Sequence, residues 1–433
     1  MEQFDKWRDK YTGLRPFLPN RLQIPKPPKG IFLVWHYLCY YFLLPIICLL
    51  RMVLAFLIFL ELCIITFVVE YPLSMLSFPP FTWFKRFYKK ITMLIYCRFL
   101  LFALGYWSID AQISETLRTR QRTIFEESST KQIKKQTNID KLTKTKSQTK
   151  ILKKSSDLKF NSGDLIIANS NSIASILYLG FRFAPQFTVM PNNWKEGEGY
   201  PGEDGCVKKR NLITCIFDLL FNIKHEKNGK NLKKYIPLAQ LIKQSKKRSG
   251  GPVVVFPDGL STNGSGMLEF LPIFEDSNLE KDQPNKIVLL GFKNLKKTRK
   301  NQIFNPSFSI GNPFKHLVST CYPLANKLMV KIINPIEVPL LPKPTIESQQ
   351  NEKDNESDES NENSDQESSD EFEHSNENSQ KMIIWTEMLQ ESLCKGLKVQ
   401  KTKFVTIDKF EFMEAWKERE MQFKNKEKEK KEK

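Results

Sequence analysis

Residues 253–272 read VVVFPDGLSTNGSGMLEFLP, and this stretch says most about the fold. Its first four residues are β-branched or aromatic and predict a short buried strand. Three glycines and Asn263 follow closely, and they allow backbone conformations in which several N–H groups converge on an anion. The hydroxyl groups of Ser261 and Thr262 add hydrogen-bond donors. The stretch therefore predicts a strand that ends in a phosphate-binding turn, and the alternative is a surface turn between two strands.

The sequence around this stretch alternates strand-like and helix-like segments. The expected strands cover residues 164–168, 185–190, 253–256, 286–292 and 328–333. The expected helices cover residues 172–183, 211–223, 232–245 and 382–396. Such alternation is typical of an α/β sandwich with a mainly parallel sheet, which is the fold class that we expect.

Two apolar runs precede the α/β region. Residues 31–50 contain no Asp, Glu, Lys or Arg, and residues 52–69 contain only Glu61. Each run approaches the length that crosses the hydrocarbon of a bilayer. Because only Arg51 separates the runs and basic residues flank both ends, we expect a membrane helical hairpin over 31–70 with both ends in the cytosol. The hairpin would cross the bilayer or enter one leaflet, and a buried helix pair of a soluble core is the alternative.

Three further segments have distinctive compositions. Residues 81–107 mix aromatic, basic and apolar side chains, which is typical of a helix that lies among lipid headgroups. The alternative is a third helix that crosses the membrane. Residues 112–159 predict a mobile basic insertion, and residues 346–380 predict a disordered acidic linker. The expected order is a cytosolic segment 1–30, the hairpin, the interfacial helix, an α/β domain 108–345, the linker, a helical segment 381–415 and a charged tail 416–433.

The charge of the chain is unevenly distributed. Residues 347–377 hold 13 acidic residues and one Lys, a contribution of −12 to the net charge of +18, so the remainder carries +30. A basic body of this kind fits an anionic partner such as lipid headgroups or the phosphates of acyl-CoA. Zinc-ligand spacings and nucleic-acid-binding signatures are missing, so we expect membrane lipids rather than nucleic acid as partners. The eight cysteines include no C-x-x-C pair, which favours a reduced, cytosol-facing chain.

Residues of the opening stretch match a known motif, F-P-E-G-T-x-S or its variant E-G-T-x-x-N-G-x-x-x-L-P-F. The matching residues are Phe256, Pro257, Gly259, Asn263, Gly264, Leu268 and Phe270. On these residues the stretch resembles the third motif of the glycerolipid acyltransferases, the PlsC or lysophosphatidic acid acyltransferase family. Asp258 replaces the Glu of that motif. The opening residues Trp7-Arg8-Asp9, Thr12-Gly13 and Pro16-Phe17-Leu18-Pro19 resemble the fungal lysophosphatidic acid:oleoyl-CoA acyltransferase subgroup.

The resemblance covers roughly residues 107–339 and implies an activity. A fatty acyl group would move from acyl-CoA, as co-substrate, to lysophosphatidic acid or a similar lysophospholipid, with no bound cofactor or metal. The protein would reside in the endoplasmic reticulum membrane, on lipid droplets or in both, with its active domain facing the cytosol. The residues implied to hold the acceptor phosphate are Asp258, Gly259, Ser261, Thr262, Asn263, Gly264 and Arg210, with Lys208 and Lys209 beside the last.

The first motif of the family is N-H-x-x-x-x-D, in which the His is the general base on the glycerol hydroxyl and the Asp orients it. In this chain Asn169 matches, whereas Ser170 stands at the His position and Ser175 at the Asp position. The resemblance implies that these three residues form the reaction centre. A neutral serine cannot accept a proton near pH 7, and loss of a positioned base costs about 10²–10⁴ in rate.

Two alternatives follow from these replacements. Ser170 and Ser175 would simply cap the helix that follows them. The protein would then be a lipid-binding or organising protein that keeps the acyltransferase fold. Among other bases, we expect His225 and His316 at the surface, and Asp258 becomes a useful base only where burial raises its pKa. His36 lies in an apolar run and His374 in the acidic linker, so neither is a good candidate.

Overall fold

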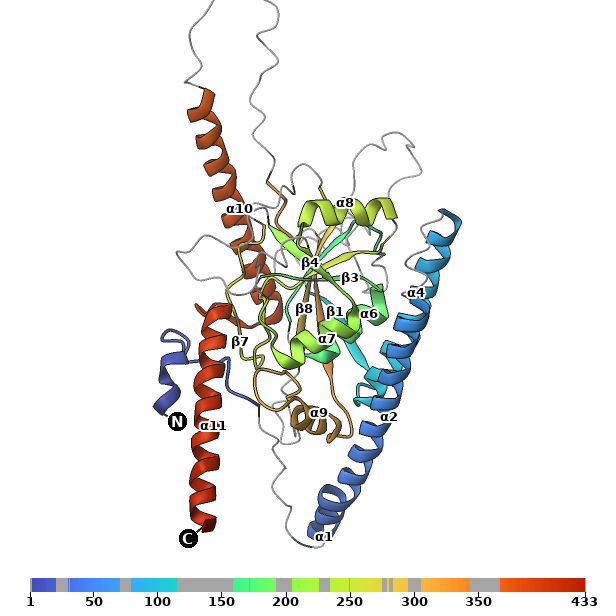
Figure 1. Ribbon diagram of the computed structural model, residues 1–433, viewed down its shortest axis with the longest axis vertical. Coiled ribbons are helices and arrows are strands. Elements are labelled where there is room, and N and C mark those ends of the chain that lie inside the picture. Colours follow the sequence, from blue (N-terminus) through green and yellow to red (C-terminus); the bar gives the residue numbers. More distant parts are fainter. Residues whose placement is uncertain are drawn as a thin grey trace, which may run out of the picture.

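A mixed sheet of eight strands forms the centre of the structure, a computed structural model (Figure 1). It describes residues 2–20, 30, 32–70, 79–114, 159–170, 172–191, 205–225, 234–248, 250–274, 279, 283–294, 305–335, 337–342 and 367–432. The strand order is β1-β9-β8-β2-β6-β3-β4-β5. Strands β8, β2, β6 and β3 are mutually parallel, whereas β9, β4 and β5 pair antiparallel with β8, β3 and β4. Edge strand β1 runs parallel to β9.

The bounds of the strands follow the apolar runs of the sequence. They are β1 Ile109–Ser114, β2 Leu165–Ala168, β3 Gln186–Val189, β4 Cys206–Arg210, β5 Ile236–Pro237, β6 Val253–Val255, β8 Ile287–Asn294 and β9 Leu328–Ile333. A separate two-stranded ladder joins β7 Gly266–Met267 to β10 Gln400–Lys401. The five expected strands are confirmed, and the fold is α/β with a mostly parallel mixed sheet.

Helices cover both faces of the sheet. Alternate residues of β2 point to opposite sides, so Ile166 packs with α4, α6 and α7, while Leu165 packs with α8 and α10. Because both faces are covered, the central strands consist almost entirely of apolar residues. The helix bounds are α4 Pro79–Ala103, α6 Ile173–Phe183, α7 Leu212–Phe221, α8 Leu238–Arg248, α9 Pro313–Cys321, α10 Glu367–Leu397 and α11 Thr406–Glu432.

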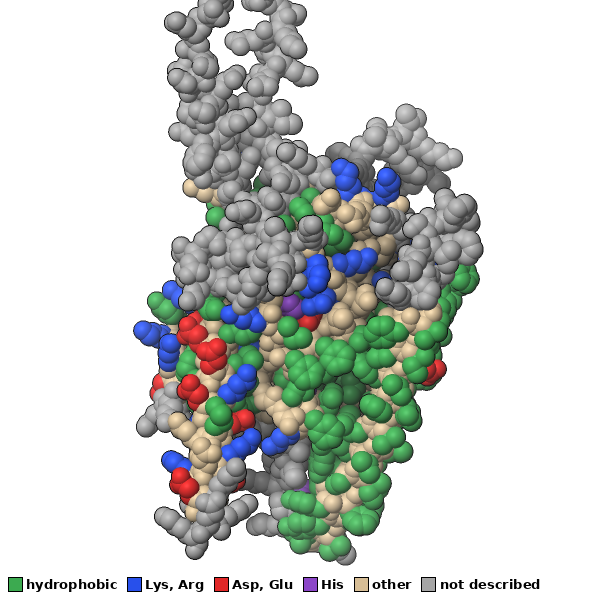
Figure 2. Space-filling view, viewed as in Figure 1, with side chains coloured by type: hydrophobic (Ala, Val, Ile, Leu, Met, Phe, Trp, Pro, Cys, Tyr) green, Lys and Arg blue, Asp and Glu red, His purple; other side chains and the backbone are tan. Residues whose placement is uncertain are grey.

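The expected hairpin over residues 31–70 is wrong. Segments α1 Phe32–Tyr37, η2 Leu38–Leu43, α2 Leu44–Ile65 and η3 Thr66–Glu70 follow one another as a continuous helix along one side of the molecule (Figure 1). Of the described helices, this one alone is long and apolar enough to cross a membrane. Helix α4 packs against α2, so the chain folds back with α4 and not within residues 31–70 as expected. Figure 2 shows apolar side chains along the outside of the long helix. Its exposed apolar residues include Trp35, Phe42, Leu50, Phe56 and Phe67.

Arg51 explains why the helix continues where a turn was expected. Its side chain is buried, and its guanidinium donates hydrogen bonds to three carbonyl oxygens after or at the end of α9. The donor–acceptor distances are 3.3 Å to Cys321, 2.6 Å to Pro323 and 2.7 Å to Leu324. Because these carbonyl oxygens accept hydrogen bonds from the guanidinium inside the protein, Arg51 does not have to lie in a solvent-exposed loop. The long helix is thereby fixed to the α/β domain.

Other segments also differ from expectation. Helix α10 begins at Glu367, inside the segment expected to be a disordered linker. The final segment, expected to be a charged helix or tail, belongs to helix α11. Strands β1 and β4 were not expected, and Lys208, Lys209 and Arg210, expected near the acceptor phosphate, lie in β4. Most of residues 81–107, expected to be an interfacial helix, form helix α4. Most of the expected basic insertion, 112–159, lies outside the described residues.

We predict that Arg51→Leu lowers the free energy of unfolding by about 2–3 kcal/mol, because three buried carbonyls lose a charged donor. The midpoint of thermal unfolding of the full chain in detergent measures this effect. Leu50→Ala, at an exposed position of the same helix, is the control and is expected to change the midpoint little. Equal midpoints for the two variants would show that Arg51 does not fix the helix to the domain.

Candidate functional site

A small cavity lies at the carboxyl ends of the parallel strands. Ser170 reaches it from the end of β2, Thr188 from β3, and Phe256 and Gly259 from the segment after β6. Helix α7 and the residues after it close the other side. The cavity has a volume of about 40 Å³, which is room for only a few water molecules. Ligand sites of open α/β sheets lie at this edge, so the cavity is the candidate reaction centre.

The bend after β6, residues 257–264, is called the third-motif bend below. Its Asp258 is buried, and Asp258 Oδ2 accepts a 2.9 Å hydrogen bond from the backbone N–H of Ser170. This bond joins the ends of β2 and β6. Asp258 Oδ1 has no hydrogen-bond partner among the described residues. Burial raises the pKa of Asp258 to about 8, opposed by the Ser170 N–H and by the charge of Lys409.

Lys409 was missed in the sequence. It lies on α11, its side chain is fully buried, and its ammonium donates to Ser261 O at 2.6 Å and to Asn222 Oδ1 at 2.5 Å. Burial lowers the pKa of Lys409 to about 7, and Asp258 opposes this shift. Both acceptor residues line the cavity, so the lysine lies directly behind its wall. The sequence offered one indication of its burial: Lys409 lies one helical turn before Phe412, on the apolar side of the helix.

Gly259 explains how closely α11 approaches the bend. Its φ of +63° is one that residues with a side chain rarely adopt. A Cβ atom at this position would lie 2.6 Å from Thr406 Cγ2 and 2.9 Å from Leu271 Cδ1. The glycine of the motif therefore serves packing against α11, and its backbone lines the cavity.

The second half of the third-motif bend holds the N-terminal segment. Asn263 Nδ2 donates to the carbonyl oxygens of Arg15 at 2.8 Å and Leu18 at 3.0 Å. Thr262 Oγ1 donates to Gly266 O and accepts from the Gly264 N–H, so these groups bind within the bend itself. The two segments on which the expected resemblance rests therefore contact each other. Of the expected phosphate ligands in the bend, Gly259 and Ser261 line the cavity, whereas Asp258, Thr262, Asn263 and Gly264 do not.

The first-motif residues have separate roles. The Asn169 side chain donates to the Phe292 carbonyl at 3.1 Å and accepts from its N–H at 2.7 Å, which clamps β2 to β8. Ser172 is the N-cap of α6, and Ser175 forms a capping box with it, so the cap assigned to Ser170 lies two residues later. Ser175 is fully buried, and only Ser170 of the three expected catalytic residues lines the cavity.

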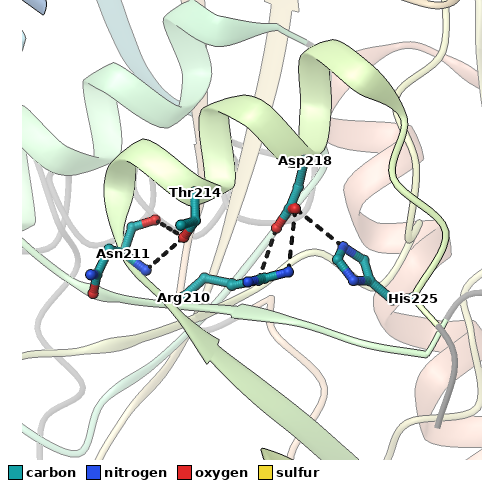
Figure 3. Close-up of polar contacts among 5 residues, drawn as sticks. All are labelled: Arg210, Asn211, Thr214, Asp218 and His225. Carbon is teal, nitrogen blue, oxygen red and sulfur yellow. Dashed lines mark hydrogen bonds and ion pairs between the residues drawn. The ribbon is translucent and has the colours of Figure 1, made fainter. Parts of the chain in front are cut away.

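A chain of polar side chains leads from β4 into the cavity. Figure 3 shows Arg210, Asp218 and His225 pointing toward one another. Arg210 Nε lies 3.0 Å from Asp218 Oδ2, and His225 Nε2 lies 3.4 Å from Asp218 Oδ1. Asp218 and His225 both line the cavity that Ser170 enters. Arg210, expected to bind phosphate, has the Asp218 carboxylate beside it and does not line this cavity.

The local sequence places His225 here. Asn211 and Thr214 form the capping box that starts α7, and Asn222 ends the helix with a φ of +47°. That left-handed residue turns the chain back along the helix toward Asp218. His225 is 6 % exposed, so its expected surface location is wrong. His316 packs its ring against Phe308 at a centroid distance of 4.8 Å and does not line the cavity.

No family model, curated protein or solved structure matches the chain. Chemically, the site unites an imidazole, a carboxylate that can orient it, and the Ser170 position at the edge of a parallel sheet. Such a base–orienter pair can activate a hydroxyl group. Among the described residues, no group of three His, Cys, Asp or Glu side chains is arranged to hold a metal ion.

We predict that Lys409→Met lowers the free energy of unfolding by about 2–3 kcal/mol, because the buried acceptors Ser261 O and Asn222 Oδ1 lose a charged donor. Thermal unfolding in detergent measures this loss, with Lys417→Met on the exposed side of α11 as the control. A Lys409→Met variant as stable as the control would show that these two hydrogen bonds do not stabilise the fold.

Proposed function

We propose that the protein is a membrane-bound acyltransferase that moves a fatty acyl group from acyl-CoA to lysophosphatidic acid or a similar lysophospholipid. The observation that carries the proposal is the His225–Asp218 pair in the cavity that Ser170 enters. The resemblance places the family's base at residue 170, where this chain has a serine. A base that reaches the same cavity from another element restores the missing chemistry.

In the proposed reaction His225 is the general base. The Asp218 carboxylate beside Nε2 favours the tautomer with the proton on Nε2 and the lone pair on Nδ1. Nδ1 takes the proton of the lysophospholipid hydroxyl as its oxygen attacks the thioester carbonyl carbon. A carbon–oxygen bond forms, the carbon–sulfur bond breaks, and the proton passes from His225 to the departing thiolate of CoA. Arg210 holds the Asp218 carboxylate in place, and the Ser170 hydroxyl donates to the oxyanion.

The long apolar helix supports a membrane location for this activity. Its outward side chains are apolar along much of its length, and α4 adds Lys85, Arg86, Lys89 and Lys90. This combination suits a helix embedded at a phospholipid surface with cations among the headgroups. The endoplasmic reticulum membrane and the lipid-droplet monolayer both provide such a surface, and both carry lipids of the proposed substrate class.

A catalytically impaired lipid-binding or organising protein is the second candidate. It is favoured by the size of the cavity, which accommodates a glycerol headgroup only after its walls move. In the first candidate this movement accompanies substrate binding, as in other enzymes that close over their substrates. Activity of the purified protein distinguishes the two candidates.

We predict that His225→Asn and Asp218→Asn each lower kcat by about 10²–10⁴, since each removes the base or its orientation. The assay follows transfer of a radiolabelled oleoyl group from oleoyl-CoA to lysophosphatidic acid by the purified full chain in detergent. His316→Gln, outside the cavity, is the control and is expected to retain activity.

Ser170→Ala is expected to lose less, about tenfold, because it removes one donor and no base. Silence of the wild type under conditions where it binds the lipid would establish the non-catalytic candidate. Full activity of His225→Asn would show that the imidazole takes no part in the mechanism.

A further inference from the structure

A second and larger cavity lies between the long apolar helix and the α/β domain. It is lined from α2 and η3, from α4, from the end of β4 and from the start of α7. Its volume is about 320 Å³, against about 40 Å³ for the cavity at Ser170. Sites for small organic ligands begin at this size. This cavity is called the helix groove below.

The helix groove is lined by two chemically different sets of side chains. Four are cationic, namely Lys85 and Lys89 of α4 and Lys209 and Arg210 of β4. The apolar set, called the apolar wall below, is Leu62, Phe67, Met93, Leu212 and Ile213. No Asp or Glu is among its described lining residues. Figure 2 shows Lys and Arg side chains gathered where β4 lies, next to the apolar surface of the long helix.

We infer that the helix groove binds one anionic, single-chain phospholipid that enters from the membrane. The phosphate lies among Lys85, Lys89 and Arg210, where ammonium and guanidinium groups form charge-assisted hydrogen bonds. The start of α7, capped by Asn211, directs its positive end to the same place. The acyl chain follows the apolar wall toward the long helix. The identity of the lipid, lysophosphatidic acid, rests on the proposed function.

Arg210 connects the helix groove to the candidate reaction centre. Its guanidinium lines the groove and also contacts Asp218, whose other oxygen lies 3.4 Å from His225 Nε2. A phosphate at Arg210 is therefore separated from the imidazole by a single carboxylate group. Arg210 is a positioning residue in this arrangement, because it binds the headgroup on one side and the carboxylate on the other.

The test measures binding without acyl-CoA, so that it does not depend on turnover. The full chain in detergent micelles is titrated with oleoyl lysophosphatidic acid, oleoyl lysophosphatidylcholine and inorganic phosphate. Wild type is expected to bind lysophosphatidic acid about tenfold more tightly than the zwitterionic lipid, and inorganic phosphate more weakly than either. Lys85→Glu with Lys89→Glu is expected to weaken lysophosphatidic acid binding about tenfold or more.

Matched variants keep the test decisive. Lys243→Glu with Lys247→Glu makes the same charge change on α8, across the sheet, and is expected to leave binding within about twofold. Lys85→Gln removes one charge with little change in shape and guards against misfolding of the double variant. Phe67→Ser, in the apolar wall, is expected to weaken lipid binding without affecting inorganic phosphate.

The possible outcomes separate the groove from the catalytic proposal. Binding that falls in the α4 variants and persists in His225→Asn supports the groove, even where no variant transfers acyl groups. Equal effects of the α4 and α8 variants, or phosphate bound as tightly as the lipid, would overturn it. If the protein transfers acyl groups but the groove variants do not change its affinity for lysophosphatidic acid, the acyltransferase proposal stands and the groove is not the acceptor site.

Discussion

The hydrogen bond from the Ser170 N–H to Asp258 is the contact on which the site depends. It joins the carboxyl ends of the two central strands and holds the third-motif bend over the cavity. A carboxyl group buried this deeply has lost its hydration, and it is tolerated only with polar or charged groups nearby. The charge of Lys409, on α11, opposes the rise that burial causes in the pKa of this carboxyl. A helix at the end of the chain is thereby made part of the site.

The same bend organises both ends of the chain. Asn263 holds the N-terminal segment by its backbone carbonyls, and Phe17 of that segment packs on Phe404 and Phe412 of the C-terminal region. Gly259 permits the start of α11 to approach the bend closely. The bend therefore has two structural roles, because one half borders the cavity and the other half binds the N-terminal segment.

The parts of the fold that sequence could predict are those with local patterns. Strands β2, β6, β8 and β9 are buried apolar runs, and α6 and α7 begin at Ser or Asn caps. The hairpin was wrong because the partners of Arg51 are carbonyls near α9, far away in the chain. His225 and Lys409 were not assigned for the same reason. Their environment comes from contacts with other elements, and no local pattern distinguishes them from surface residues.

The candidate cavity can be reached from more than one element of this fold. The turn after β2 and the segment after α7 both border the cavity at the carboxyl ends of the strands. What catalysis requires is an imidazole held by a carboxylate within reach of the hydroxyl, and this geometry does not depend on the order of the residues in the chain. A small serine at position 170 also leaves space on the side of the cavity opposite α7. In the proposed acyltransferase, Ser170 at the expected histidine position and the buried His225 are therefore consistent parts of one arrangement.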